Sequence, residues 1–325
     1  MPNLDMSYTH GVIAAREKYL LKDKIMRLCE LSAEDAFRFL IESGFGGVEN
    51  ATNVHEYENL IAAEERALDA FIKEYAPSEA ERIFLLAPRD FHNAKALVKA
   101  SYLHVDASYM LAPQGFISIE QLTQAIENGK FESLKGKNAV LAETCKAAWA
   151  SLEENPSGAK VGEIFEKALY SYLSAQTKKN AVLKKLLAAK VDMTNILTAF
   201  RCGEKTLAKE KYLPGGGLSC EQLNVLFAED NEKIRRAFSG TAYVDFIKLC
   251  LEGKERGEPM IAAEKYADGY ETEFFAKRKF DLIKSEPFLY YVYRRRTENA
   301  NVRIVFACLL AGQSEQEIKK RLRAF

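Results

Sequence analysis

Apolar residues recur along this chain at helical spacing, at positions i, i+3, i+4 and i+7, and strand-like alternation is almost absent. The pattern is clearest in three stretches, for which we predict helices over about 90–103, 192–203 and 298–311. The chain has 325 residues, of which only 8 are proline and 18 are glycine, the two residue types that break helices. The sequence therefore predicts an all-α fold.

Each of these stretches opens with an acidic residue that is followed three positions later by asparagine. The copies, 102 and 106 residues apart, are Asp90 with Asn93, Asp192 with Asn195, and Glu298 with Asn301. A wide, regular spacing indicates one supersecondary unit that is used several times. A side-chain oxygen at a helix start can accept hydrogen bonds from free backbone N–H groups, and buried polar groups need partners. We therefore interpret these six residues as structural caps of the repeats, with hydrogen bonds between lobes.

A second helix start follows each copy, at Ser118, Ser219 and Ser314, where Gln or Glu stands three residues after the serine. This is the capping-box pattern, and Ser32 begins a related segment. The predicted serine-capped helices cover about 32–42, 118–128, 219–229 and 314–323, and further long helical stretches cover about 8–28, 53–75, 138–153, 161–190 and 259–296. The last serine-capped helix has no full repeat of its own, so we expect the two chain ends to pack together.

These signals divide the chain into approximate repeats 1–117, 118–218 and 219–325, which we expect to be three related helical lobes. Pro and Gly mark short breaks, but no linker is long enough to separate free domains. The prediction is therefore a single rigid body over residues 1–325.

The charge is balanced, with 46 Lys and Arg against 46 Asp and Glu, which argues against a protein that coats nucleic acid. The longest apolar run, 304–312, is well short of the roughly 20 residues that a membrane helix needs. The first five residues lack the basic start and apolar block of a secretory signal. We expect a soluble, cytoplasmic protein.

Catalytic motifs are absent from the sequence. The six cysteines form no C-x-x-C, which favours ordinary buried or half-buried thiols, and the four histidines form no H-E-x-x-H. One alternative is a metal-dependent hydrolase with Asp90 and Asp192 as ligands, but one carboxylate per repeat is few for a divalent ion. The glycine cluster Leu213–Leu218 favours a tight interhelical loop over a phosphate cradle, because no strand precedes it. We predict no catalytic, cofactor-binding or metal-binding residue.

Basic residues near the C-terminus form a candidate docking patch for an acidic protein surface or anionic lipid, with a solvated helix face as the alternative. The patch consists of Arg294, Arg295, Arg296, Lys319, Lys320 and Arg321. The neighbouring aromatic segment 288–293 is expected to be core.

In this order and spacing, the motifs resemble the C subunit of archaeal and bacterial A/V-type rotary ATPases, which is related to the d subunit of eukaryotic vacuolar ATPases. The resemblance spans nearly the whole chain. The resemblance rests on the three copies of the acidic-x-x-Asn motif and on a set of further residues. These are Tyr8, Arg16, Lys95, Gly115, Arg201, the Leu213–Leu218 loop, Glu286, Pro287, Arg303, Gly312, Glu315, Ile318 and Leu322.

The resemblance implies an all-α, pseudo-threefold funnel of three similar lobes that belongs to the rotor and central stalk. It implies a non-catalytic accessory subunit, one copy per complex, that couples the central shaft subunits to the membrane ring of ion-carrying subunits during ion transport or ATP synthesis. No cofactor, small-molecule substrate or nucleic acid is implied, and the protein would be peripheral to the membrane through the complex. Whether the ion is hydrogen or sodium stays open, as does the alternative of a soluble all-α adaptor or scaffold without a motor.

Overall fold

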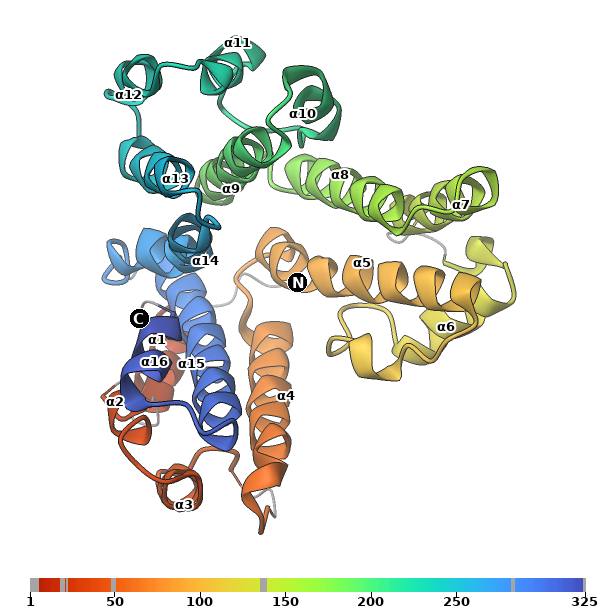
Figure 1. The fold of residues 1–325 in the computed structure, drawn as a ribbon. Helices are drawn as coiled ribbons and strands as arrows, with labels where there is room; N and C mark the ends of the chain where they lie inside the picture. Colours follow the sequence, from red (N-terminus) through yellow and green to blue (C-terminus); the bar gives the residue numbers. More distant parts are fainter. Residues whose placement is uncertain are drawn as a thin grey trace. The chain divides into compact units, whose positions relative to one another are not determined.

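The computed structural model describes residues 6–17, 21, 23–47, 51–134, 139–281 and 284–323. Within these ranges the secondary structure is α-helical, with short 3-10 turns and no strand, which confirms the predicted all-α fold (Figure 1). None of the helices in these ranges is both long and apolar enough to cross a bilayer.

The chain forms two compact units, one made of Met1–Glu79 with Asp268–Phe325 and the other of Ala80–Ala267. Each unit has a hydrophobic core of its own. The predicted arrangement of three lobes as a funnel, and the prediction of one rigid body, stay predictions.

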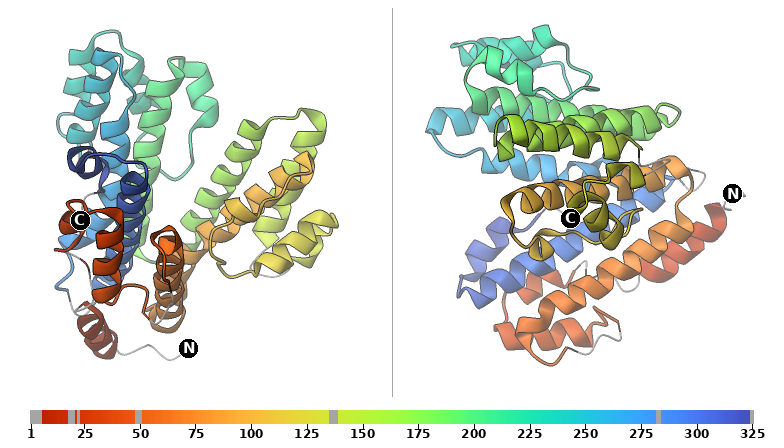
Figure 2. Two further views of the ribbon diagram at one scale, coloured as in Figure 1. Left: turned by 60° about the horizontal axis from the view of Figure 1, so that its bottom comes forward. Right: turned by 90° about the vertical axis from the view of Figure 1, so that its right-hand side faces the viewer.

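In the first unit, α15 lies alongside α4 in each view (Figures 1 and 2). The helices of this unit are α1 (Met6–Glu17), α2 (Ile25–Leu28), α3 (Ala33–Glu42), α4 (Tyr57–Tyr75), α15 (Glu286–Leu310) and α16 (Glu315–Arg321). Phe71 of α4 stacks on Phe288 at a centroid distance of 5.4 Å and meets the edge of Tyr291 at 4.9 Å. The segment 288–293 is buried throughout, which confirms that it is core.

The two ends of the chain share one hydrophobic core, as predicted. Ile318 of α16 and the following Leu322 are buried in the same cluster as Leu28 of α2, Phe37 of α3 and Val302 of α15. Lys319 also pairs with Glu30 at 3.2 Å. Because α16 fills part of the core around α2 and α3, the C-terminal segment contributes directly to the stability of the first unit.

The second unit contains α5 to α13 and residues 261–267 of α14, whose residues 268–276 belong to the first unit. Their bounds are α5 Glu79–Leu103, α6 Ile119–Glu127, α7 Ala139–Glu154, α8 Gly158–Gln176, α9 Ala181–Cys202, α10 Lys205–Lys211, α11 Cys220–Asn224, α12 Asn231–Phe238, α13 Val244–Arg256 and α14 Ile261–Ala276. A three-residue connection turns α7 back on α8 as an antiparallel pair. Together with α5 and α6, this pair encloses one core that includes Phe91, Ile126, Cys145 and Phe165.

The serine caps are where the sequence placed them. Ser118, Ser219 and Ser314 each accept a hydrogen bond from the backbone N–H three residues on, and each completes a capping box. Ser32 caps α3 by accepting from the Asp35 N–H. The predicted helix 219–229 is shorter in the structure, where α11 ends at Asn224 and continues as the 3-10 turn Val225–Phe227.

The predicted starts at Asp90, Asp192 and Glu298 are wrong. These residues lie inside α5, α9 and α15, which begin at Glu79, Ala181 and Glu286. The apolar residues upstream of each copy are also buried, so tertiary packing extends each helix towards its N-terminus.

Three predicted helical stretches are divided in the structure. The stretch 259–296 ends as α14 at Ala276 and resumes as α15 at Glu286, with residues 282 and 283 outside the described residues. The stretch 161–190 breaks after Gln176, and Asn180 caps the start of α9. The stretch 8–28 includes α1 and α2 as separate helices, with residues 18–20 and 22 outside the described residues.

We predict that Ile318→Ala lowers the free energy of unfolding by about 2–5 kcal/mol, because it removes a fully buried side chain that packs the chain ends together. Urea unfolding followed by circular dichroism would measure the loss. Ile41→Ala in α3 is the matched control, since Ile41 is 41% exposed and its truncation should change stability by less than about 0.5 kcal/mol. Equal losses for the two variants would contradict the packing role of α16.

Candidate functional site

The asparagine of each repeat makes the same pair of hydrogen bonds with one distant residue. Its side-chain amide donates to the backbone C=O of that residue, and its Oδ1 accepts from the backbone N–H of the same residue. We call each such pair an asparagine clamp. The donor–acceptor distances are 3.0 and 2.8 Å for Asn93 with Ala112, 3.0 and 2.7 Å for Asn195 with Leu213, and 3.1 and 2.8 Å for Asn301 with Arg323.

The aspartates of the first two repeats hold the segment that leads into the next serine-capped helix. Asp90 accepts from the N–H groups of Phe116 at 2.9 Å and Ile117 at 3.2 Å, directly before Ser118. Asp192 accepts from Gly217 and Leu218, each at 3.0 Å, directly before Ser219.

Together, aspartate and asparagine fasten a long loop to the middle of a buried helix at two places. The six residues of the motif are all buried, with exposed fractions of 0–4%. The interpretation of these residues as helix caps therefore changes. In the first two repeats, the aspartate binds backbone N–H groups just before the following serine-capped helix, and it does not cap the helix in which it lies.

Glu298 of the third repeat forms a different contact. Its Oε2 accepts from Arg295 at 2.9 Å, its Oε1 lies 3.5 Å from Nε of Arg294, and Arg295 also pairs with Glu64 of α4. The asparagine clamp keeps its form here, but Asn301 binds a residue that follows α16 instead of one that precedes a serine-capped helix. In this repeat, the ion pair of Arg295 with Glu64 joins α15 to α4, and contacts of Glu298 with two arginines of its own helix replace the carboxylate–backbone contact.

Glycine permits the close approach of each loop to its aspartate. A Cβ atom on Gly115 would lie 2.6 Å from Asp90 Oδ1 and 2.6 Å from the carbonyl oxygen of Leu86. A Cβ atom on Gly216 would collide with Asp192 Oδ1, and Gly215 has a φ of +93°, a conformation that favours glycine. The cluster Leu213–Leu218 is thus a tight interhelical loop, as the sequence indicated.

These contacts argue against the metal and phosphate alternatives. Both carboxylate oxygens of Asp90 and of Asp192 face N–H hydrogens, which would repel a cation. N–H groups of the glycine loop point at Asp192, so they are occupied by a carboxylate of the chain itself. Among the described residues, no three His, Cys, Asp or Glu side chains are grouped so as to hold a metal ion.

The six basic residues do not form one exposed patch. Arg294 and Arg295 are buried, so the prediction of a docking role is wrong for both. Arg296 is half-buried with its guanidinium 5.8 Å from the ring centre of Tyr293, and half-buried Lys319 pairs with Glu30 and Glu315. Lys320 and Arg321 are exposed, and for these two a docking role stays a prediction. The sequence could not show which of these six residues are buried, because the run Arg294–Arg296 lies in α15, a helix that is buried around most of its circumference.

The cysteines are free thiols. Cys29, Cys145, Cys250 and Cys308 are buried and Cys202 is half-buried, whereas Cys220 is exposed, contrary to expectation. Burial raises the pKa of the Cys145 and Cys250 thiols to about 12, which keeps them protonated and unreactive at neutral pH.

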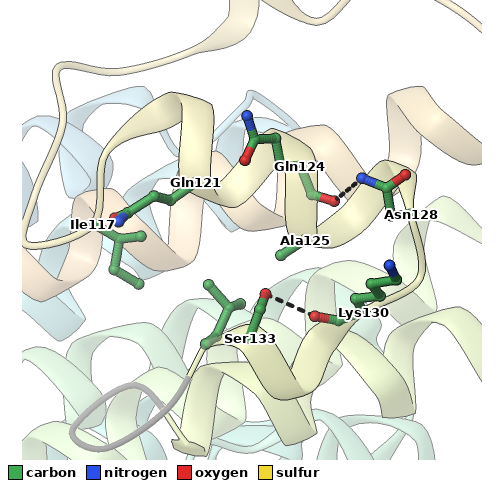
Figure 3. Close-up of a pocket in the computed structure, with 8 residues that line it drawn as sticks. Ile117, Gln121, Gln124, Ala125, Asn128, Lys130 and Ser133 are labelled. Carbon is green, nitrogen blue, oxygen red and sulfur yellow. Dashed lines mark hydrogen bonds between the residues drawn. The ribbon is translucent and has the colours of Figure 1, made fainter.

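A polar hollow of about 420 Å³ lies beside α6 (Figure 3). Three of its polar side chains bond to the local backbone. Asn128 donates to the carbonyl oxygen of Gln124, and Ser133 donates to that of Lys130. Gln121 accepts from the Ser118 N–H in the capping box. Because these polar groups stabilise helix ends, we assign no ligand to this hollow.

This geometry is that of a helical scaffold in which buried side chains repeatedly fasten loops to helix centres. The family model described as ATP synthase (C/AC39) subunit matches residues 10–321, so the chain belongs to this family and the resemblance is confirmed.

Three relatives extend along nearly the whole chain. It is 24% identical to the C subunit of the V-type ATP synthase from Thermus thermophilus, over 97% of this chain and 98% of the relative. It is 21% identical to the C subunit of the V-type sodium ATPase from Enterococcus hirae, over 94% and 92%. It is 22% identical to the C subunit of the A-type ATP synthase from Halobacterium salinarum, over 95% and 97%.

We predict that Gly115→Ala destabilises the protein by about 1–3 kcal/mol, because the added methyl group collides with Asp90 and a backbone carbonyl. The matched control is Gly162→Ala in α8, where the Cβ atom meets nothing within 4 Å and the helix should gain about 0.5–1 kcal/mol. Urea unfolding would measure both. If Gly115→Ala were as stable as Gly162→Ala, the close approach would be absent in solution.

We also predict a pH dependence that Asp90→Asn removes. Burial raises the pKa of the Asp90 carboxyl above its ordinary value, and the N–H groups of Phe116, Ile117 and Gly115 offset only part of the rise. The folded protein therefore keeps this proton to a higher pH than the unfolded chain does. The free energy of unfolding of wild type, relative to that of Asp90→Asn, should be greatest at pH values below the pKa of Asp90 in the unfolded chain. It should fall as the pH rises through the pKa of Asp90 in the folded protein. The fall is about 1.4 kcal/mol for each tenfold difference between the acid dissociation constants of the folded and unfolded states.

Urea unfolding from pH 4 to 7 would measure this difference, with Asp245→Asn, an exposed residue of α13, as the control. A difference between wild type and Asp90→Asn that stayed constant, or grew with pH, would contradict the raised pKa.

Proposed function

We propose that this chain is a non-catalytic rotor subunit of an A/V-type ATPase or ATP synthase, and that it couples the central shaft subunits to the membrane ring of ion-carrying subunits. The observation that carries the proposal is the family match over residues 10–321, which leaves almost no part of the chain for a separate activity. The relatives are named as C subunits of V-type and A-type complexes over nearly their full length.

The asparagine clamps support a mechanical role. A coupler must transmit torque without local opening, and loops are ordinarily the parts of a protein that open most easily. Here the loops are fixed by hydrogen bonds to buried side chains, which are strong in a low-dielectric interior. The ion pair of Arg295 with Glu64 holds α15 against α4 in the same way, and Glu298 of α15 also pairs with Arg295.

The test is deletion of this chain in its source organism, followed by assays on inverted membrane vesicles. We expect ATP-driven ion uptake to be lost while ATP hydrolysis persists or detaches from the membrane, because the catalytic part would no longer drive the ring. Purified wild-type protein added back should restore uptake, and the same protein after heat unfolding should not. A tagged copy should purify together with the shaft and ring subunits.

Ion uptake that survived the deletion, together with a tagged copy that purified without any ATPase subunit, would refute the proposal. That result would instead favour a soluble adaptor with other partners.

A further inference from the structure

A half-open groove of about 310 Å³ lies in the second unit between the end of α5, the loop that follows it, and α6. Its apolar lining includes Leu97 of α5, Val105 and Leu111 of the loop, and Ile119 and Ile126 of α6. The groove shares no lining residue with the polar hollow beside the same helix, and it is lined mainly by carbon.

The loop also exposes large apolar side chains to an unusual degree. Val105 is 50% exposed, and in the same short segment Leu103 is 65% and Tyr109 is 78% exposed. A single exposed apolar residue needs no explanation, but several within seven residues mark a surface that associates with another molecule.

The charged residues that line the groove are Asp106 and Glu127, and its described lining includes no lysine or arginine. The Ser108 hydroxyl and N–H donate to Asp106 and hold the pKa of that carboxyl below its ordinary value, so it is ionised at neutral pH. An apolar floor with an acidic edge is complementary to a partner that is apolar on one side and cationic beside it.

The groove is held open by the framework described above. The Asn93 clamp fixes Ala112 at the end of the loop, and His104 takes a φ of +53° where the chain leaves α5. A surface that is ordered before binding loses less conformational entropy when a partner arrives.

We propose that this groove binds an amphipathic α-helix of another subunit, with apolar anchors between α5 and α6 and with Lys or Arg facing Asp106 and Glu127. A helix suits the site because its walls are helices and the described chain offers no strand edge for an added strand. The inference rests on the proposed function, which supplies the complex in which the partner is found.

The experiment is photo-crosslinking in the assembled complex. Benzoylphenylalanine replaces Val105 in the tagged full-length chain, and the complex is purified from membranes, irradiated and analysed by mass spectrometry. We expect an adduct with one other subunit, at a helical peptide that contains Lys or Arg. Benzoylphenylalanine in place of Val244, which is 43% exposed on α13, should give no such adduct.

A charge test separates the acidic edge from the apolar floor. Asp106→Asn with Glu127→Gln retains the shape of the groove and should lower the adduct yield about tenfold at low salt. Glu120→Gln, an exposed change on α6 outside the groove lining, should leave the yield unchanged.

If shaft and ring subunits are present but Val105 yields no adduct, or yields one only with lipid or a second copy of this chain, the groove proposal is wrong and the proposed function stands. If these subunits are absent from the purified material, the proposed function fails and the groove proposal fails with it.

Discussion

Three buried asparagines that bind the backbone of residues far along the chain determine how loops and helices meet in this fold. Asn93, Asn195 and Asn301 each satisfy one backbone N–H and one backbone C=O of a single residue, at distances of 2.7–3.1 Å. Leaving a buried polar group without a hydrogen-bond partner costs about 1–3 kcal/mol of folding stability. The asparagine amide and the backbone groups that it binds would therefore each destabilise the fold without the other. The clamp therefore specifies which loop residue sits against which helix, as well as adding stability.

The acidic residue of each repeat shows that one position can make two kinds of contact. Aspartate is short and reaches backbone N–H groups of a loop, provided that glycine at 115 or 216 allows the loop to approach. Glutamate is longer, and Glu298 joins Arg295 and Glu64 in a buried network instead. Breaking such a pair leaves an uncompensated buried charge, which is far more costly than losing an exposed ion pair.

These contacts make a mechanical role physically reasonable for a member of this family. The loops of the repeats are fastened to helices, and the segment from Leu103 to Tyr109, which carries exposed apolar residues, is followed closely by the clamped Ala112. A stiff scaffold with local, differently charged surfaces can contact several neighbours in a defined register, because electrostatics selects orientation more than it adds affinity.

Local patterns in the chain were sufficient to predict the helical class, the serine caps and the repeat. Helical periodicity and capping boxes are short-range signals, with partners three or four residues apart, so Ser118, Ser219 and Ser314 could be placed correctly. The glycine cluster also indicated a tight loop, although nothing in the spacing identified Asp192 as the group that it meets.

Three-dimensional packing was needed to show where the repeat helices begin, what Asp90 and Asn93 bind, and which arginines are accessible. The partners of these two residues lie 19 to 27 positions away, beyond any periodic signal. Arg294 and Arg295 resemble surface residues in composition, but α15 is enclosed on nearly all sides, and the buried Glu298 pairs with both. The burial of these arginines depends on segments far away in the chain, and a local pattern carries no information about such contacts.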